Sequence, residues 1–152
     1  MLNPADAAFA DRLAALLPEG RLRDPEPRHL EEPRGRYRGQ GGVLALPQTV
    51  QEVSTLVAAA HEARIPVLPY GGGTGLVAGQ VAPDGPAPLL ISMEKMTAIR
   101  AVYPAENVMI AEAGAILADV QAAAEAENRL FPLSLAAQGS CRIGGNLATN
   151  AG

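Results

Sequence analysis

The chain has 152 residues, of which 48% are hydrophobic and 18% are charged, and its formal net charge is −4. This composition is typical of one globular domain with a sizeable core and excludes a largely disordered chain. The acidic balance, the 3% of aromatic residues and the lack of Trp exclude the basic, base-stacking surface that nucleic acid requires. One cysteine and two histidines give neither a disulfide nor a metal-ligand spacing, so no metal site is expected.

No targeting or membrane-spanning segment is recognisable in the sequence. The N-terminus has no basic region followed by an apolar run, which a signal peptide would show. No apolar stretch is as long as a helix that crosses a bilayer. The sequence therefore predicts a cytoplasmic protein without a membrane span.

Residues 1–40 are expected to form a helix and a connector. Residues 4–17 have the apolar spacing of an amphipathic helix, and residues 18–40 are rich in Pro, Arg and Glu. Since the arginines of this connector alternate with acids and prolines, it is expected to be irregular and solvated. Residues 41–152 are expected to form the main domain.

Strand and helix patterns alternate after residue 41. Residues 43–47 are expected to form a strand, and Thr49 is a suitable N-cap for a helix that ends near Arg64. Residues 65–69 predict a buried strand that Pro66 and Pro69 delimit. The further expected elements are strands over 89–93, 99–103 and 108–113, a helix over 115–128, and a short strand over 129–133. This order predicts an α+β fold with a mixed β-sheet flanked by helices.

The most informative segment is a glycine-rich loop, PYGGGTGL, which follows the strand expected over 65–69. Its four glycines allow positive φ and a close approach of the backbone to a ligand. Successive N–H groups in such a turn form a concave nest for an anion, and the Thr74 hydroxyl adds a donor. The loop therefore predicts a phosphate or pyrophosphate site, although an ordinary glycine-rich turn without a ligand has the same composition.

Two well-known phosphate-binding motifs fit this loop less well. A Walker A loop ends in a lysine that reaches the phosphates, and the one lysine of the chain, Lys95, lies elsewhere. The spacing Gly73-x-Gly75-x-x-Ala78 matches a Rossmann fingerprint, in which a helix must begin within the motif. The glycines and prolines of the following LVAGQVAPDGPAP exclude such a helix. A phosphate held by loop amides alone is the better interpretation.

A second segment of small residues, GSCRIGGNLATNAG, occupies positions 139–152. It offers backbone amides, hydroxyls and carboxamides without bulk, so it can lie against a large flat ligand and bond the polar edges of that ligand. A purely structural glycine-rich loop is the alternative. Two such segments beside one sheet favour ligand binding.

These residues resemble the flavin-binding domain of the vanillyl-alcohol oxidase and p-cresol methylhydroxylase (PCMH) superfamily. The unit VLALPQTVQEVSTLVAAAHEARIPVLPYGGGTGL resembles the opening strand, helix, strand and pyrophosphate loop of the family, and LLISMEKM and VMIAEAGAILADVQ resemble the segments that follow. FPLSLAAQGSCRIGGNLATNAG is similar to the branch that contains D-2-hydroxyglutarate dehydrogenase, D-lactate dehydrogenase and the glycolate oxidase subunit. The resemblance covers residues 42–152.

The resemblance implies the N-terminal part of a PCMH-type FAD-binding domain. The bound FAD is expected to be non-covalent, because the glycine loop lacks the histidine that tethers flavin in some members of the family. The residues implied to contact the cofactor are Pro69, Tyr70, Gly71, Gly72, Gly73, Thr74, Gly75, Leu76, Gly114, Pro132, Leu133, Gly139, Ser140, Gly144, Gly145, Asn146, Thr149 and Asn150.

The resemblance also implies a reaction, in which a D-2-hydroxyacid is oxidised to a 2-oxoacid by hydride transfer to FAD. The electron acceptor is unknown. Because members of this branch are much longer, the chain is expected to be an N-terminal fragment that is inactive alone and lacks the substrate-binding arginine, metal-binding histidines and bases of the family. Ser140 and Cys141 have no histidine near them in sequence, so no catalytic residue is expected in this chain.

Two other functions stay open. The first is another flavin oxidoreductase with the same domain, such as a sugar-lactone oxidase or the UDP-N-acetylmuramate-forming reductase, although the GSC-x-IGGN-x-ATNAG string disfavours it. The second is a non-catalytic module that no longer holds flavin. Such a module would expose a sheet edge and an apolar face, and would therefore form a homo-oligomer.

Overall fold

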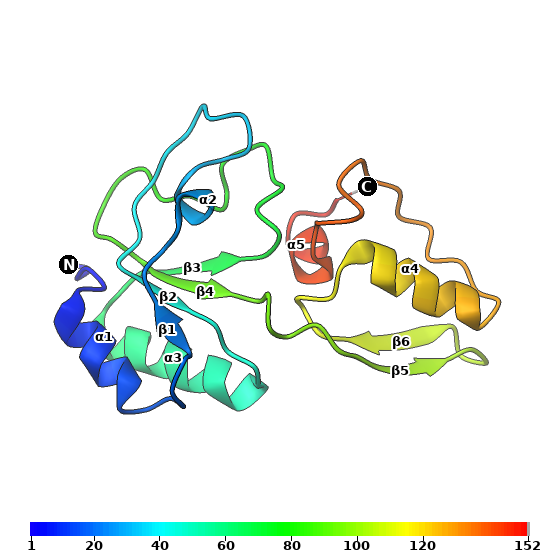
Figure 1. The fold of residues 1–152 in the computed structure, drawn as a ribbon, viewed down its shortest axis with the longest axis horizontal. Coiled ribbons are helices and arrows are strands. Elements are labelled where there is room, and N and C mark those ends of the chain that lie inside the picture. The colour runs from blue at the N-terminus through cyan, green and yellow to red at the C-terminus, as the bar shows by residue number, and fades with distance from the viewer. Residues whose placement is uncertain (152) are drawn as a thin grey trace.

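The protein, seen here in a computed structural model that describes residues 1–151, has two lobes (Figure 1). The elements of the first lobe are α1 (Ala7–Ala14), β1 (Leu22–Arg23), α2 (Pro27–Leu30), β2 (Val43–Ala45), α3 (Val50–Ala63), β3 (Val67–Tyr70) and β4 (Leu89–Ser92). The elements of the second lobe are β5 (Ile99–Tyr103), β6 (Val108–Ala111), α4 (Leu117–Ala126) and α5 (Ile143–Ala148). The chain passes from the first lobe to the second between β4 and β5.

The first lobe contains the mixed sheet that the sequence predicts. Its strand order is β1-β2-β4-β3, in which β1 is antiparallel to β2 and the other pairs are parallel. In this register Leu90 of β4 lies between Leu44 of β2 and Leu68 of β3. All four residues of β4 are buried, as expected of a central parallel strand that is covered on both faces.

The strand before the glycine loop differs from its prediction. β3 is an edge strand of the sheet, and Val67 is 36% exposed, so the expectation of a buried strand is wrong. Pro69 does not end the strand but lies inside it, opposite Ile91. An edge strand tolerates proline because its outer side needs no N–H donor for a neighbouring strand.

Helices cover the two faces of this sheet unequally (Figure 1). α1 and α3 pack on one face around a core made of Ala5, Phe9, Leu13, Val43, Ala45, Leu56, Ala59, Ala60, Ile65, Leu89 and Ile91. The ends of α3 are as predicted, since the Thr49 side chain accepts from the N–H of Glu52 and Arg64 closes the helix in the left-handed conformation. α1 is shorter than predicted, because Asp6 caps it and it ends at Ala14.

The connector over residues 18–40 is more ordered than its composition suggests. It contributes β1 to the sheet and α2 to the other face, where a Cβ on Gly41 would lie 2.1 Å from Cδ1 of Leu90. His29 and Glu32 are buried, and Arg21 pairs with Glu52 at 2.9 Å. The arginines of the connector are mostly solvated, as predicted, since Arg23, Arg28, Arg34, Arg36 and Arg38 are exposed. The two short elements and the buried His29 and Glu32 were not predicted, because ion pairs and backbone contacts compensate their polarity.

The second lobe is built from the β5–β6 hairpin and α4. Ala115, Val120 and Ile143 form its small core. The short strand expected over 129–133 does not form; there the carbonyl of Leu133 accepts from the Gln121 side chain at 2.7 Å. α5 was not expected, because Gly144 and Gly145 lie inside it.

Among the described residues, no helix combines the length and the apolar character needed to cross a bilayer.

Candidate functional site

The glycine loop after β3 presents a row of unpaired backbone donors. No acceptor for the N–H groups from Gly71 to Leu76 is found within residues 1–151. No helix forms between β3 and β4, as the sequence predicts. Gly73 has φ of +68°, the left-handed region in which glycine is unstrained. Since unpaired N–H groups seek an acceptor, the loop has the donor pattern of an anion site.

The structure brings the second small-residue segment directly against this loop. A Cβ on Gly72 would lie only 2.2 Å from the carbonyl oxygen of Ser140, and a Cβ on Gly71 would lie 3.6 Å from Cβ of Arg142. In Figure 1 the loop after β3 accordingly reaches across to α5 of the second lobe. The two segments that the sequence singled out are therefore one surface, formed where the lobes meet.

The far side of that surface is open. A Cβ on Gly139 or Gly145 would meet nothing within 4 Å, so both positions leave room for a ligand. The Asn146 side chain is buried, and its Oδ1 has no donor among the described residues. Thr149 Oγ1 donates back to the carbonyl of Gly145 at 2.8 Å, and Asn150 takes a left-handed φ of 50°.

Other predicted site residues have contacts within the protein. A Cβ on Gly114 would lie 1.8 Å from the carbonyl oxygen of Met93, and one on Gly144 would lie 2.9 Å from that of Ala113. Gly114 therefore permits close packing where the lobes join, and Gly144 permits close packing of α5 within the second lobe. Pro132 and Leu133 lie beyond α4, and no hydrogen bond joins them to the glycine loop within the described residues.

Residues of the connector contact Tyr70, which lies at the start of the glycine loop. The Tyr70 hydroxyl donates to the carbonyl of Arg28 at 2.6 Å, and the Tyr70 ring contacts the ring of His29 edge-on at 4.8 Å between centroids. His29 Nδ1 accepts from the N–H of Glu26 at 3.0 Å, which requires a neutral ring. Burial, together with the nearby Arg28 charge, lowers the pKa of His29, and burial raises the pKa of Tyr70.

A buried carboxylate shapes the part of the connector that reaches over the loop. Glu32 is 1% exposed and accepts from the N–H groups of Arg34 at 3.1 Å and Arg36 at 2.9 Å. The Arg34 guanidinium also donates to the carbonyl of Leu76, in the glycine loop. Burial alone would raise the pKa of Glu32, but these N–H groups and the Arg34 charge lower it below its ordinary value of 4.5.

We expect the Glu32→Gln variant to unfold several degrees below the parent at neutral pH. The pKa of Glu32 is lower in the folded chain, so its contribution is fully present above the ordinary value of 4.5 and is lost as the pH falls through the folded pKa. The gap in Tm should therefore shrink in acid. Glu31→Gln is the matched control, because Glu31 forms only an exposed pair with Arg38. A gap that stays constant with pH would contradict this role.

The Gly145→Ala variant distinguishes a role of Gly145 in packing from a role in leaving space for a ligand. A Cβ at this position meets no atom within 4 Å, and alanine favours a helix over glycine by about 0.5–1 kcal/mol. The variant should therefore be as stable as the parent or slightly more stable by thermal unfolding. If the open space holds the ligand, the added methyl should weaken ligand binding severalfold. Unchanged binding would remove Gly145 from the site.

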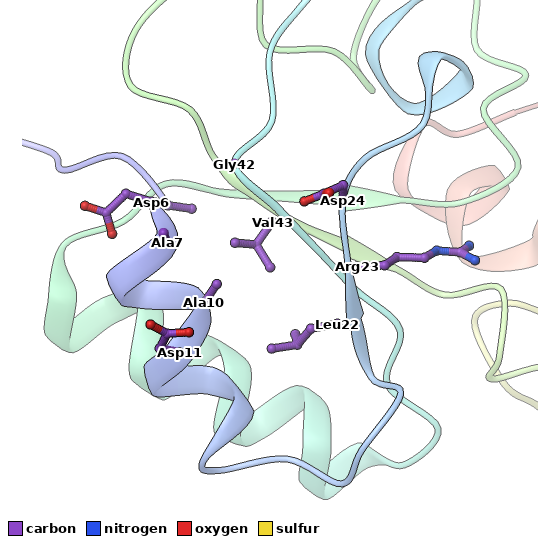
Figure 2. A pocket seen from close by; sticks show the side chains of 10 residues that line it. Asp6, Ala7, Ala10, Asp11, Leu22, Arg23, Asp24, Gly42 and Val43 are labelled. Atoms are coloured by element: carbon purple, nitrogen blue, oxygen red, sulfur yellow. The ribbon is translucent and has the colours of Figure 1, made fainter.

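A separate hollow of about 580 Å³ lies between α1 and β1 (Figure 2). Asp6, Asp11, Arg23 and Asp24 line it together with small apolar residues. None of the predicted site residues lines it, and the described residues contain no group of three or more potential metal ligands. It is therefore distinct from the surface formed by the two glycine-rich segments.

Two features of the site were not predicted from the sequence. One is the support of Tyr70 by the connector, for which the sequence gives no local signal, because the contact spans 42 positions. The other is Arg142, which lies beside Gly71. The sequence feature that could have identified Arg142 is its charge, since it is the one basic residue after Arg129.

Comparison with known proteins connects this surface to a cofactor. The family described as "FAD binding domain" matches residues 42–152. D-2-hydroxyglutarate dehydrogenase, mitochondrial, of Bos taurus is 35% identical over 98% of this chain, and D-2-hydroxyglutarate dehydrogenase of Xanthomonas citri pv. viticola is 39% identical over 72% of it. The chain spans 28% and 23% of the length of those two relatives.

Solved structures show the same fold. An alkyldihydroxyacetonephosphate synthase superposes with a TM-score of 0.82 at 22% identity, over 96% of this chain and 30% of its own length. The unpaired N–H groups of the glycine loop and the open space at Gly139 and Gly145 fit a large anionic cofactor. The chain therefore belongs to the FAD-binding domain family, in the PCMH-type fold of the FAD-linked oxidases, and its cofactor is FAD.

Proposed function

We propose that this chain is the FAD-binding part of a flavin-dependent D-2-hydroxyacid dehydrogenase of the D-2-hydroxyglutarate or D-lactate type. One observation carries the proposal: a glycine loop with unpaired N–H groups closes against the backbone of residues 139–141, the Ser140 turn, to form one surface. The relatives named D-2-hydroxyglutarate dehydrogenase, at 35% and 39% identity, support this substrate class.

The backbone of the glycine loop would hold the cofactor by its diphosphate. The N–H groups from Gly71 to Leu76 are the donors, and the Thr74 hydroxyl is one more. The open positions Gly139 and Gly145 would border the flavin and its ribityl chain. This contact would be non-covalent, because the glycine loop contains no histidine.

When bound, FAD supplies the redox chemistry, accepting a hydride from the α-carbon of the 2-hydroxyacid as the 2-oxoacid forms. The role of this chain would be to bind and orient the cofactor. The Ser140 hydroxyl donates to the carbonyl of Ala137, and Cys141 is buried. His29 lies behind Tyr70 and His61 lies on α3, so neither activates these side chains as nucleophiles. We assign no catalytic residue to this chain and expect it to be inactive alone.

The substrate class is tested with the flavin-loaded protein in the form that its source produces. Anaerobic addition of D-2-hydroxyglutarate or D-lactate should bleach the visible flavin band, whereas the L-enantiomers and an aldonolactone should not. Reduction by the lactone alone would favour a sugar-lactone oxidase instead. Flavin that binds but is reduced by none of these compounds would contradict the substrate class while leaving the FAD-binding role intact.

A further inference from the structure

Two arginines of the described chain, Arg21 and Arg142, are partly buried, and they differ in what balances their charge. Arg21 pairs with Glu52, with its Nε 2.9 Å from the carboxylate. For Arg142, no carboxylate lies within 4.0 Å in the part of the chain that the structure describes. Since a partly buried charge without a partner is costly, an anion from outside the chain would stabilise Arg142.

The side chain of Arg142 lies at the glycine loop. A Cβ on Gly71 would be 3.6 Å from Cβ of Arg142 and 3.9 Å from its Cγ. One terminal nitrogen of the guanidinium donates to the carbonyl of Gly114, in the segment between β6 and α4 of the same lobe. The Nε atom is buried and has no acceptor among the described residues. An arginine has five N–H donors, and the protein covers the one on Nε, so the terminal nitrogens of Arg142 keep the donors that a ligand could use.

The glycine loop itself contributes dipoles but no net charge. The other arginine known to touch it, Arg34, donates to the carbonyl of Leu76, but its charge is matched by the buried carboxylate of Glu32 at 3.5 Å. Arg142 is therefore the cation beside this loop whose charge no carboxylate within the described residues balances. A diphosphate, which is strongly anionic, would balance the charge of Arg142.

We propose that Arg142 is a cofactor-binding residue, whose guanidinium contacts the diphosphate of FAD together with the N–H groups of the glycine loop. This inference rests on the proposed FAD binding. The bond to Gly114 holds the guanidinium in place before the ligand arrives, so little side-chain entropy is lost on binding. The ligand feature that Arg142 recognises is the phosphate charge and not the flavin ring.

The test compares FAD with riboflavin, which has the flavin ring and ribityl chain but no phosphate. We expect Arg142→Gln to weaken FAD binding about tenfold at low salt, as one lost charge-assisted hydrogen bond implies. Riboflavin affinity should not change. Arg142→Lys keeps the charge and should retain most of the FAD affinity. FAD affinity of the parent should fall with added salt more steeply than that of Arg142→Gln.

Arg64→Gln is the matched control, because Arg64 is exposed at the C-terminal end of α3, before β3, whereas the glycine loop follows the end of β3. It removes the same charge and should leave FAD affinity unchanged. A merely structural Arg142 would lower FAD and riboflavin affinity alike, with no change in salt dependence, and that result would overturn the inference. Equal FAD affinity in Arg142→Gln and the parent would also overturn it. No FAD binding by the folded parent would instead contradict the proposed function itself.

Discussion

Replacing Gly72 by alanine should weaken FAD binding about tenfold or more, because a clash worth about 1–3 kcal/mol falls where the two halves of the site touch. The added Cβ would lie 2.2 Å from the carbonyl oxygen of Ser140 and 3.1 Å from Cα of Cys141. Both neighbours are backbone atoms, so neither can rotate away. The glycine loop would have to separate from the Ser140 turn, and the N–H groups would no longer face the open space beyond it.

The control for this experiment is Gly79→Ala, which lies just after the glycine loop in the connection between β3 and β4. A Cβ on Gly79 meets nothing within 4 Å, and neither Gly72 nor Gly79 has a positive φ, so the two variants differ in steric contact alone. Flavin fluorescence measures the affinity, and circular dichroism shows that the variants are folded. If Gly72→Ala binds FAD as tightly as Gly79→Ala, the contact between the two segments does not shape the site.

The second large effect is expected at Gly114, where alanine should lower the free energy of unfolding by about 1–3 kcal/mol or more even without flavin. The added Cβ would lie 1.8 Å from the carbonyl oxygen of Met93 and 2.6 Å from that of Met96. Gly114 has no positive φ, so the cost comes from this overlap and not from backbone conformation. Chemical denaturation of the flavin-free chain measures it.

Gly145→Ala provides the contrast to Gly114→Ala. The methyl at Gly145 has free space, so it should leave the flavin-free stability intact and affect binding only. The methyl at Gly114 should lower the free energy of unfolding even in the flavin-free chain. An unchanged unfolding curve for Gly114→Ala, with weakened FAD binding, would show that this glycine serves the cofactor and not the packing of the lobes.

The parts of the fold that depend on local chemistry could be predicted from the sequence. Thr49 marks the start of α3 because its hydroxyl caps the helix, and the loop after β3 lacks a helix because glycine and proline prevent one. The glycine loop and the segment over 139–152 were both recognised as ligand-binding candidates from residue type alone. Their unpaired donors and open space agree with that interpretation, while the individual cofactor contacts stay predictions.

The parts that depend on distant contacts could not be predicted. β3 looked buried because its residues are apolar, yet strand order alone places it at the edge. Most arginines of the connector are solvated, as their charge predicts, but no local signal showed that β1 joins the sheet or that backbone donors of its own loop bury Glu32. α5 forms despite two glycines, with Ile143 buried in the core of the second lobe. The cytoplasmic location stays a prediction.

The central claim is that the two glycine-rich segments form one FAD site within this chain. The most direct test is a titration of FAD with the purified 152-residue protein, followed by flavin fluorescence and by the visible absorption band. We expect saturable binding that weakens in Gly72→Ala and persists in Gly79→Ala. A chain that is folded by circular dichroism and leaves the flavin signal unchanged at every ratio would contradict the claim.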